Sequence, residues 1–132
     1  MSAHTWKSMI ALLALVFLLT ACGGGAKSDA AAQTVENYLT ALVAQDADQL
    51  STASCQAWEE NALLDMDAFI GVTASLDQMA CKVSGTDGDT TLVTCEGKIL
   101  ATYNNEQQEL DLAGQTYQVV QEGGEWRVCG YR

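Results

Sequence analysis

The side chains that could do chemistry are few and unevenly placed along the chain. Its 132 residues include one histidine, five cysteines, four tyrosines and seventeen acidic residues. The histidine, His4, lies just before Lys7 and the unbroken apolar run Met9–Leu19. A run of this length is too short for a membrane-spanning helix, which needs about 20 apolar residues, and is typical of a signal peptide. We therefore expect His4 to be removed with residues 1–21.

The residues that follow this run resemble the lipobox of bacterial lipoproteins. Leu19 to Cys22 read Leu-Thr-Ala-Cys, and three glycines come next. In that family the cysteine thiol carries a diacylglyceryl group and the chain is cut before the cysteine. The resemblance implies lipidation of Cys22 and a membrane anchor through its acyl chains, at the outer face of the cell membrane or at the outer membrane. An ordinary secretory signal is the alternative.

Removal of the leader excludes several function classes. Without His4, the mature chain has no Ser-His-Asp triad, no Cys-His pair and no His-ligated metal site. Six basic residues against seventeen acidic ones give a formal net charge of −11, so nucleic acid is disfavoured as a partner. Asp65–Asp67 and Asp87–Asp89 lack the spacing of a calcium loop. We therefore expect no metal and no cofactor.

Four cysteines remain beside Cys22, and an even number in a small exported domain predicts two disulfides. They are Cys55, Cys81, Cys95 and Cys129. Zinc ligands come in closely spaced pairs, which this set does not contain. Their pairing depends on the elements that carry them.

The first elements are predicted to be helical. Residues 22–29 form a polar, glycine-rich tether, and Asp29 is a suitable N-cap for a helix from Ala30 to Ala44. Its apolar residues lie on one helical face, namely Val35, Leu39, Leu42 and Val43. Asp46–Asp48 interrupts this stripe and caps a short helical turn through Leu50.

A second helical period runs from Trp58 to about Gln78. It fits one helix kinked at Gly71, or two helices divided at Asp65–Asp67. The sequence leaves both arrangements open.

After residue 80 the apolar period changes to two, which predicts strands. The expected strands are Cys81–Ser84, Val93–Tyr103, Leu110–Val119 with a bulge at Ala113–Gly114, and Trp126–Tyr131. The expected turns are Gly85–Asp89, Asn104–Asn105 and Glu122–Glu125. Two or three helices followed by four hairpin-linked strands make a single α+β domain over residues 30–132.

Four cysteines allow three disulfide pairings. Cys81 and Cys95 flank a predicted turn and can face each other across a hairpin, which leaves Cys55 for Cys129. The pairing Cys55–Cys81 with Cys95–Cys129 requires the helical stretch to fold back, because about 20 helical residues rise about 30 Å. We favour the first pairing and keep the second open. In the first, Cys129 must reach Cys55 around a sheet edge or through a bend.

The two halves of the domain together resemble the cystatin-like, nuclear-transport-factor-2-like superfamily. The first helix closes in Ala-Gln-Asp-Ala-Asp over Ala44–Asp48, and the last hairpin spans Tyr117–Val128 and contains Gly-Glu-Trp-Arg-Val. The resemblance implies helices packed on a curved four-stranded antiparallel meander, with a cone-shaped pocket that some members use and others fill. Enzymes of the superfamily place an Asp base and a Tyr or acid donor in the cone. This sequence has no identifiable catalytic motif, so no catalytic residue is predicted.

Several aromatic residues are the candidates for lining the pocket, namely Trp58, Phe69, Tyr103, Tyr117 and Trp126. We expect a non-enzymatic domain that binds a small apolar ligand or an envelope protein. A module that dimerises through its sheet is the alternative, and an isomerase or cyclase is the remote one. A hollow apolar cone with one or two polar groups favours ligand binding. A filled cone favours the structural module, and an inward-facing Asp paired with a Tyr favours the enzyme.

Overall fold

The computed structural model describes residues 25–132, with side chains from residue 29. The predicted signal peptide and the lipidation of Cys22 lie outside these residues. Three helices come first and antiparallel strands follow, which confirms the α+β class. Within the described residues, no helix has the length and apolar character needed to cross a membrane.

The helices are α1 (Gly25–Ala44), α2 (Ala47–Ala53) and α3 (Glu59–Asp67). α1 begins five residues earlier than predicted, so Asp29 lies inside the helix and does not cap it. The expected tether is followed directly by the alanine run Ala30–Ala32, and because alanine has the highest helix propensity this run favours extension of the helix toward the N-terminus. Asp46 caps α2 as predicted, because its carboxylate accepts a hydrogen bond from the backbone N–H of Gln49 at 3.1 Å.

The predicted helical period up to Gln78 is wrong beyond Asp67. α3 ends there, the chain turns through Gly71 with a φ of 77°, and strand β1 begins at Thr73. β1 (Thr73–Asp87) alternates between exposed and half-buried residues, with one shift of phase beside Asp77. A shifted alternation also places apolar residues three or four positions apart, so it matched a helical stripe in the sequence.

The sheet has five strands where four were expected. After β1 come β2 (Thr90–Tyr103), β3 (Glu106–Asp111), β4 (Thr116–Glu122) and β5 (Glu125–Tyr131). A 3₁₀ turn, Leu112–Gly114, lies where the bulge was predicted and divides the expected third strand into β3 and β4. Both halves pair with β2, and the strand order is β1-β2-β4-β5. The meander is therefore correct apart from this break.

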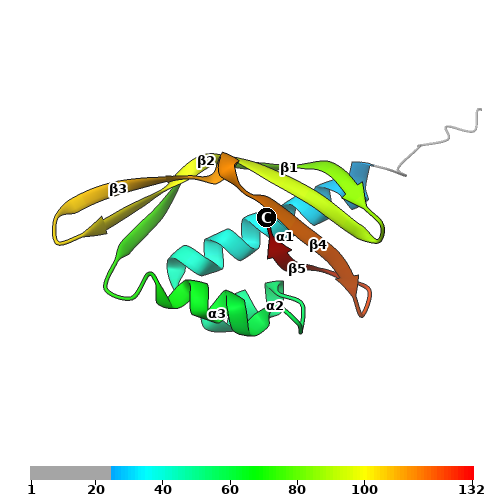
Figure 1. Cartoon of the computed structure of the whole chain (residues 1–132), viewed down its shortest axis with the longest axis horizontal. Coiled ribbons are helices and arrows are strands. Elements are labelled where there is room, and N and C mark those ends of the chain that lie inside the picture. The colour runs from blue at the N-terminus through cyan, green and yellow to red at the C-terminus, as the bar shows by residue number, and fades with distance from the viewer. Residues whose placement is uncertain (1–24) are drawn as a thin grey trace, which may run out of the picture.

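Gly97 marks the bend of the sheet. β2 pairs with β4 over Thr91–Thr94 and with β3 over Lys98–Tyr103, so it changes partner across this point. Gly97 has a φ of 95°, and a Cβ there would lie 2.6 Å from the carbonyl oxygens of Asp77 and Gln78 on β1. Only glycine permits this approach. Figure 1 shows the resulting curvature, with the sheet arching over α1 and the β2–β3 hairpin reaching past the helices.

The core lies between α1 and the concave face of the sheet. Its largest fully buried side chains are Val35, Tyr38, Leu39, Leu50, Val93, Val119 and Val128. Tyr38 and Leu39 follow Val35 on α1 by three and four positions, which places all three on one helical face.

The structure contains the favoured disulfide pairing. Cys81 and Cys95 are direct partners across β1 and β2, with Cα atoms 4.0 Å apart. Cys55 and Cys129 have Cα atoms 5.2 Å apart. Two disulfides indicate a non-cytoplasmic environment.

Cys129 reaches Cys55 by both of the routes that the sequence required. The N–H of Cys55 donates to the carbonyl of Val128 at 2.8 Å, so the segment after α2 runs along the free edge of β5. The β4–β5 register shifts between Val128 and Tyr131, which places an extra residue in β5 at Cys129–Gly130. This bulge bends the strand and brings Tyr131 back to the inner face with Val128.

Candidate functional site

A cavity of about 530 Å³ lies in the cone between α1, α3 and the sheet. Its floor consists of the buried side chains Leu39, Leu42, Ile99 and Leu112. Its walls are Leu64, Phe69 and Leu110, and Leu64 and Leu110 are exposed toward the mouth. The cone is therefore hollow and mostly apolar.

The elements explain why these side chains converge. Tyr38 and Leu42 lie four residues apart on α1, and Leu64 and Ala68 lie four apart along α3 and its C-terminal cap, so each pair lines one helical face. The break at Leu112–Gly114 turns the chain inward and buries Leu112, which is 3% exposed.

A cluster of polar groups lies at one side of the cavity. The hydroxyl of Tyr131 donates to Asp65 Oδ2 at 3.2 Å, and the hydroxyl of Tyr117 donates to Gln115 Oε1 at 2.9 Å. Trp58 Nε1–H donates to the hydroxyl of Tyr38 at 3.2 Å. The Tyr38 hydroxyl accepts this bond and donates none to another described residue, so its proton is available to a ligand.

The three phenols stay protonated at neutral pH. Burial raises the pKa of Tyr38 to about 12, although the hydrogen bond from Trp58 opposes the shift. Burial also raises the pKa of Tyr117, and it raises the pKa of Tyr131, to which the neighbouring Asp65 carboxylate adds. The cavity therefore presents neutral hydroxyl groups beside a carboxylate.

The aromatic rings of the cluster pack edge to face. Ring centroids are 5.5 Å apart for Trp58 and Tyr131, and 6.0 Å apart for Tyr117 and Tyr131. Such contacts hold the phenols in place around the cavity.

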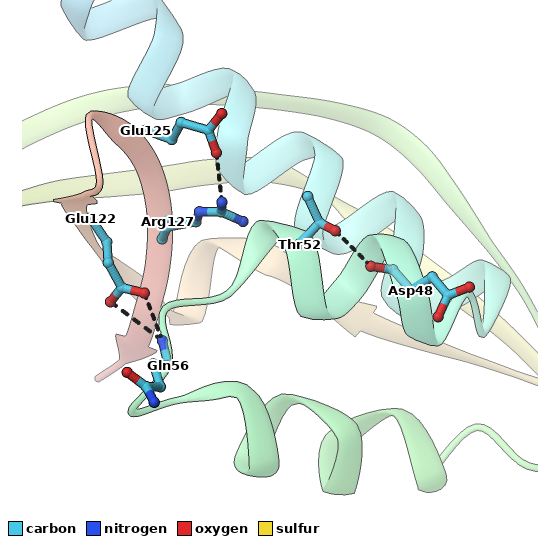
Figure 2. A network of polar contacts seen from close by, with 6 residues as sticks. All are labelled: Asp48, Thr52, Gln56, Glu122, Glu125 and Arg127. Carbon is cyan, nitrogen blue, oxygen red and sulfur yellow. Dashed lines mark hydrogen bonds and ion pairs between the residues drawn. The ribbon is translucent and has the colours of Figure 1, made fainter.

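A second hollow, of about 730 Å³, is an open groove outside the cone. It lies between α1, α2 and the β4–β5 hairpin. Figure 2 shows polar contacts on these elements from close by. Arg127 donates to Glu125 at 2.5 Å, and the backbone N–H of Gln56 lies 3.2 Å and 3.4 Å from the two carboxylate oxygens of Glu122. The groove is open and most of the side chains that line it are polar, so it is the weaker ligand site although it is the larger hollow.

Comparison with known proteins places the fold. No protein-family model and no curated protein sequence matches the chain. Among solved structures, it is similar to a candidate ketosteroid isomerase from Shewanella frigidimarina, with a TM-score of 0.50 and 15% identity over 77% of this chain and 92% of that one. At this identity the likeness shows a shared fold, in which helices pack on a curved antiparallel sheet.

Two further solved structures are similar at TM-scores of 0.46. One is a cystatin-like protein of unknown function from Nostoc punctiforme, 10% identical over 75% of this chain and 83% of that one. The other is an NTF2-like protein of unknown function from Pseudomonas putida, 13% identical over 75% of this chain and 79% of that one. Identities this low concern the fold alone.

The predicted pocket residues are spread over three places in the fold. Phe69 and Tyr117 line the cone cavity, and Trp58 packs behind it. Tyr103 is 59% exposed and lines a separate hollow of about 280 Å³. Trp126 lines the groove outside the cone.

Most residues that line the cavity were not among the predicted pocket residues, and those that matter most for its chemistry are Tyr38, Asp65 and Tyr131. Tyr38 carried a usable signal, because it precedes Leu42 by four residues on the apolar face of α1. Tyr131 carried none, because the bulge at Cys129–Gly130 reverses the face expected from strand alternation.

Proposed function

We propose that this protein is an exported, lipid-anchored domain that binds a small apolar ligand in the cone cavity without catalysing a reaction. The observation that carries the proposal is the cavity of about 530 Å³ with an apolar floor and polar groups beside it. Ligand sites in proteins are typically about 300–1,000 Å³ and combine these two features.

The cavity can contribute both to the affinity for a ligand and to its orientation. The leucines of the floor offer apolar surface, and burial of a ligand's apolar area contributes about 25 cal/mol per Å². The free proton of Tyr38 can bond to an acceptor on the ligand and orient it. A hydroxyl or carbonyl on an otherwise apolar molecule fits this pair of demands.

The test uses one probe and two matched variants. The probe is decan-1-ol, and binding is measured by isothermal titration calorimetry and by NMR chemical shifts. Ala68→Trp places a large ring at the mouth of the cone cavity, whereas Ala53→Trp places the same ring in the groove outside it. Both positions close a short helix, so the helical contexts are comparable.

We expect the wild-type chain to bind the alcohol and Ala68→Trp to weaken binding by about tenfold or more. Ala53→Trp should bind as the wild type does. Absence of binding by the wild type, or loss of binding only in Ala53→Trp, would refute the proposal.

The Tyr131–Asp65 hydrogen bond favours a second candidate, proton transfer on a bound ketone. The neighbour from Shewanella frigidimarina is described as a candidate ketosteroid isomerase. In such a reaction the Asp65 carboxylate takes a proton from the carbon beside the carbonyl, and the electron pair moves to the carbonyl oxygen, which accepts a hydrogen bond from Tyr38. The proton then returns to carbon.

Deuterium exchange distinguishes this candidate from simple binding. Decan-2-one is incubated with the protein in heavy water, and deuterium beside the carbonyl is measured by mass spectrometry. Exchange above the buffer rate that disappears in Asp65→Asn supports the enzyme. Exchange at the buffer rate by a chain that binds the ketone eliminates it.

A further inference from the structure

The charged groups that line the cone cavity are all acidic. Asp65, Glu109 and Asp111 line it. Among the residues whose side chains are described, 29–132, no lysine or arginine lines it. The three tyrosines are neutral, because burial raises their pKa values.

Each basic residue of this part of the chain forms an ion pair with an acidic residue. Their ion pairs are Lys82–Glu96 at 3.8 Å, Lys98–Glu109 at 2.6 Å, Arg127–Glu125 at 2.5 Å and Arg132–Asp87 at 3.4 Å. Only one of these pairs touches a carboxylate of the cavity, that of Glu109.

Of the other two carboxylates, Asp111 lies opposite Lys98 across β2 and β3, whereas Asp65 forms no ion pair among the described residues. Asp65 accepts its hydrogen bond from the neutral phenol of Tyr131, and Asp111 accepts from the backbone N–H of Ala113 at 2.8 Å. These bonds satisfy lone pairs without cancelling the negative charge.

We propose that the ligand of this cavity is an organic cation, with an apolar body on the leucine floor and an ammonium group beside Asp65. This inference rests on the proposed function and specifies the class of ligand. A neutral ligand leaves the negative charge uncompensated, and an apolar anion such as a fatty acid is repelled by it.

The experiment compares three probes that share a ten-carbon chain and differ in their head group. They are decyltrimethylammonium, decan-1-ol and decanoate, each titrated calorimetrically below its micelle concentration at low salt. We expect the ammonium probe to bind about tenfold more tightly than the alcohol, and decanoate to bind more weakly than the alcohol. Because salt screens exposed charges, added salt should reduce this difference.

Two matched variants assign the preference to the cavity. Asp65→Asn removes a negative charge inside it at nearly constant shape, and Asp87→Asn removes one outside it. The ratio of the alcohol and ammonium dissociation constants should fall toward one in Asp65→Asn and stay unchanged in Asp87→Asn. If Asp65→Asn does not fold, Asp111→Asn takes its place, because asparagine also caps helices well.

The outcomes separate the two proposals. Equal binding of alcohol and ammonium overturns the cation inference and leaves the apolar pocket standing. An equal effect of Asp65→Asn and Asp87→Asn also overturns it, because net charge alone would then attract the cation. If none of the three probes binds, the proposed function itself fails.

Discussion

Replacement of Gly97 by alanine tests whether the bend of β2 builds the cone. Gly97 lies in the segment where β2 changes partner from β4 to β3. The added methyl group would lie 2.6 Å from the carbonyl oxygens of Asp77 and Gln78, and both of these atoms belong to backbone. The variant must therefore strain Gly97 or move β1.

The expected cost follows from two unfavourable terms and one favourable term. A non-glycine residue held at a φ of 95° costs about 1–3 kcal/mol. The clash with two carbonyl oxygens adds about 1–3 kcal/mol, the usual cost of overpacking. The lower entropy of the unfolded alanine chain offsets about 0.4–1 kcal/mol. We expect Gly97→Ala to lower the free energy of unfolding by about 3 kcal/mol.

Gly85→Ala is the matched control. Gly85 also lies in a strand, β1, but its φ is not positive and a Cβ there meets no atom within 4 Å. We expect this variant to lie within about 0.5 kcal/mol of the wild type, as for other unstrained surface changes.

Urea unfolding followed by circular dichroism measures both variants, and titration with decan-1-ol reports on the cavity. Gly97→Ala should also bind the alcohol more weakly, because the bend carries the β3 wall of the cone. A stability of Gly97→Ala within about 0.5 kcal/mol of the wild type would show that β2 does not require this conformation.

Four further predictions concern the disulfides, pH, anchoring and assembly. Loss of Cys55–Cys129, whose cysteines are 74 positions apart, should lower the free energy of unfolding by about 4 kcal/mol. Loss of Cys81–Cys95, whose cysteines are 14 positions apart, should lower it by about 3 kcal/mol. The reverse order in urea unfolding would contradict the chain-entropy argument. The pKa of Tyr38 is about 12 in the folded chain and about 10 in the unfolded chain. Its contribution to stability is therefore complete below about pH 10 and is lost as the pH rises through about 12. Tyr117 acts in the same direction, and thermal melts that show no loss of stability across this window would exclude the effect. Cys22→Ser should release the protein from membranes, because serine has no thiol for a thioether, and intact mass without a diacylglyceryl increment in the wild type would contradict the lipobox prediction. A homodimer formed through the sheet stays a prediction, and light scattering of the lipid-free Cys22→Ser chain would give its mass directly.

Local patterns predicted most of the elements correctly because their signals do not depend on distant contacts. Asp46 caps α2 because its carboxylate accepts from the N–H of Gln49, three residues later. Asn104 and Asn105 form a turn with positive φ values of 49° and 65°. The helix end at Asp67 was missed because the apolar residues of 69–76 fit both the period of a helix and the shifted alternation of a strand. Only pairing with β2 decides that Thr73–Leu76 is a strand.

The disulfide pairing was predicted correctly from a premise that was partly wrong. The sequence argument assumed a long helical stretch between Cys55 and Cys81, whereas that stretch ends at Asp67 and the chain turns at Gly71. The pairing holds because the β1–β2 register places Cys81 opposite Cys95.

The sequence by itself determined the α+β order, the turns and the Cys81–Cys95 disulfide, since each depends on neighbouring residues or on one hairpin, and Cys55–Cys129 followed from it by elimination. The tertiary structure decided that the cone is hollow and that Asp65 meets Tyr131, two residues 66 positions apart. A bulge at Cys129–Gly130 turns Tyr131 inward, and the close approach at Gly97 bends the sheet around the space. Both depend on atoms brought together from separate strands, so the site exists only once the sheet has formed.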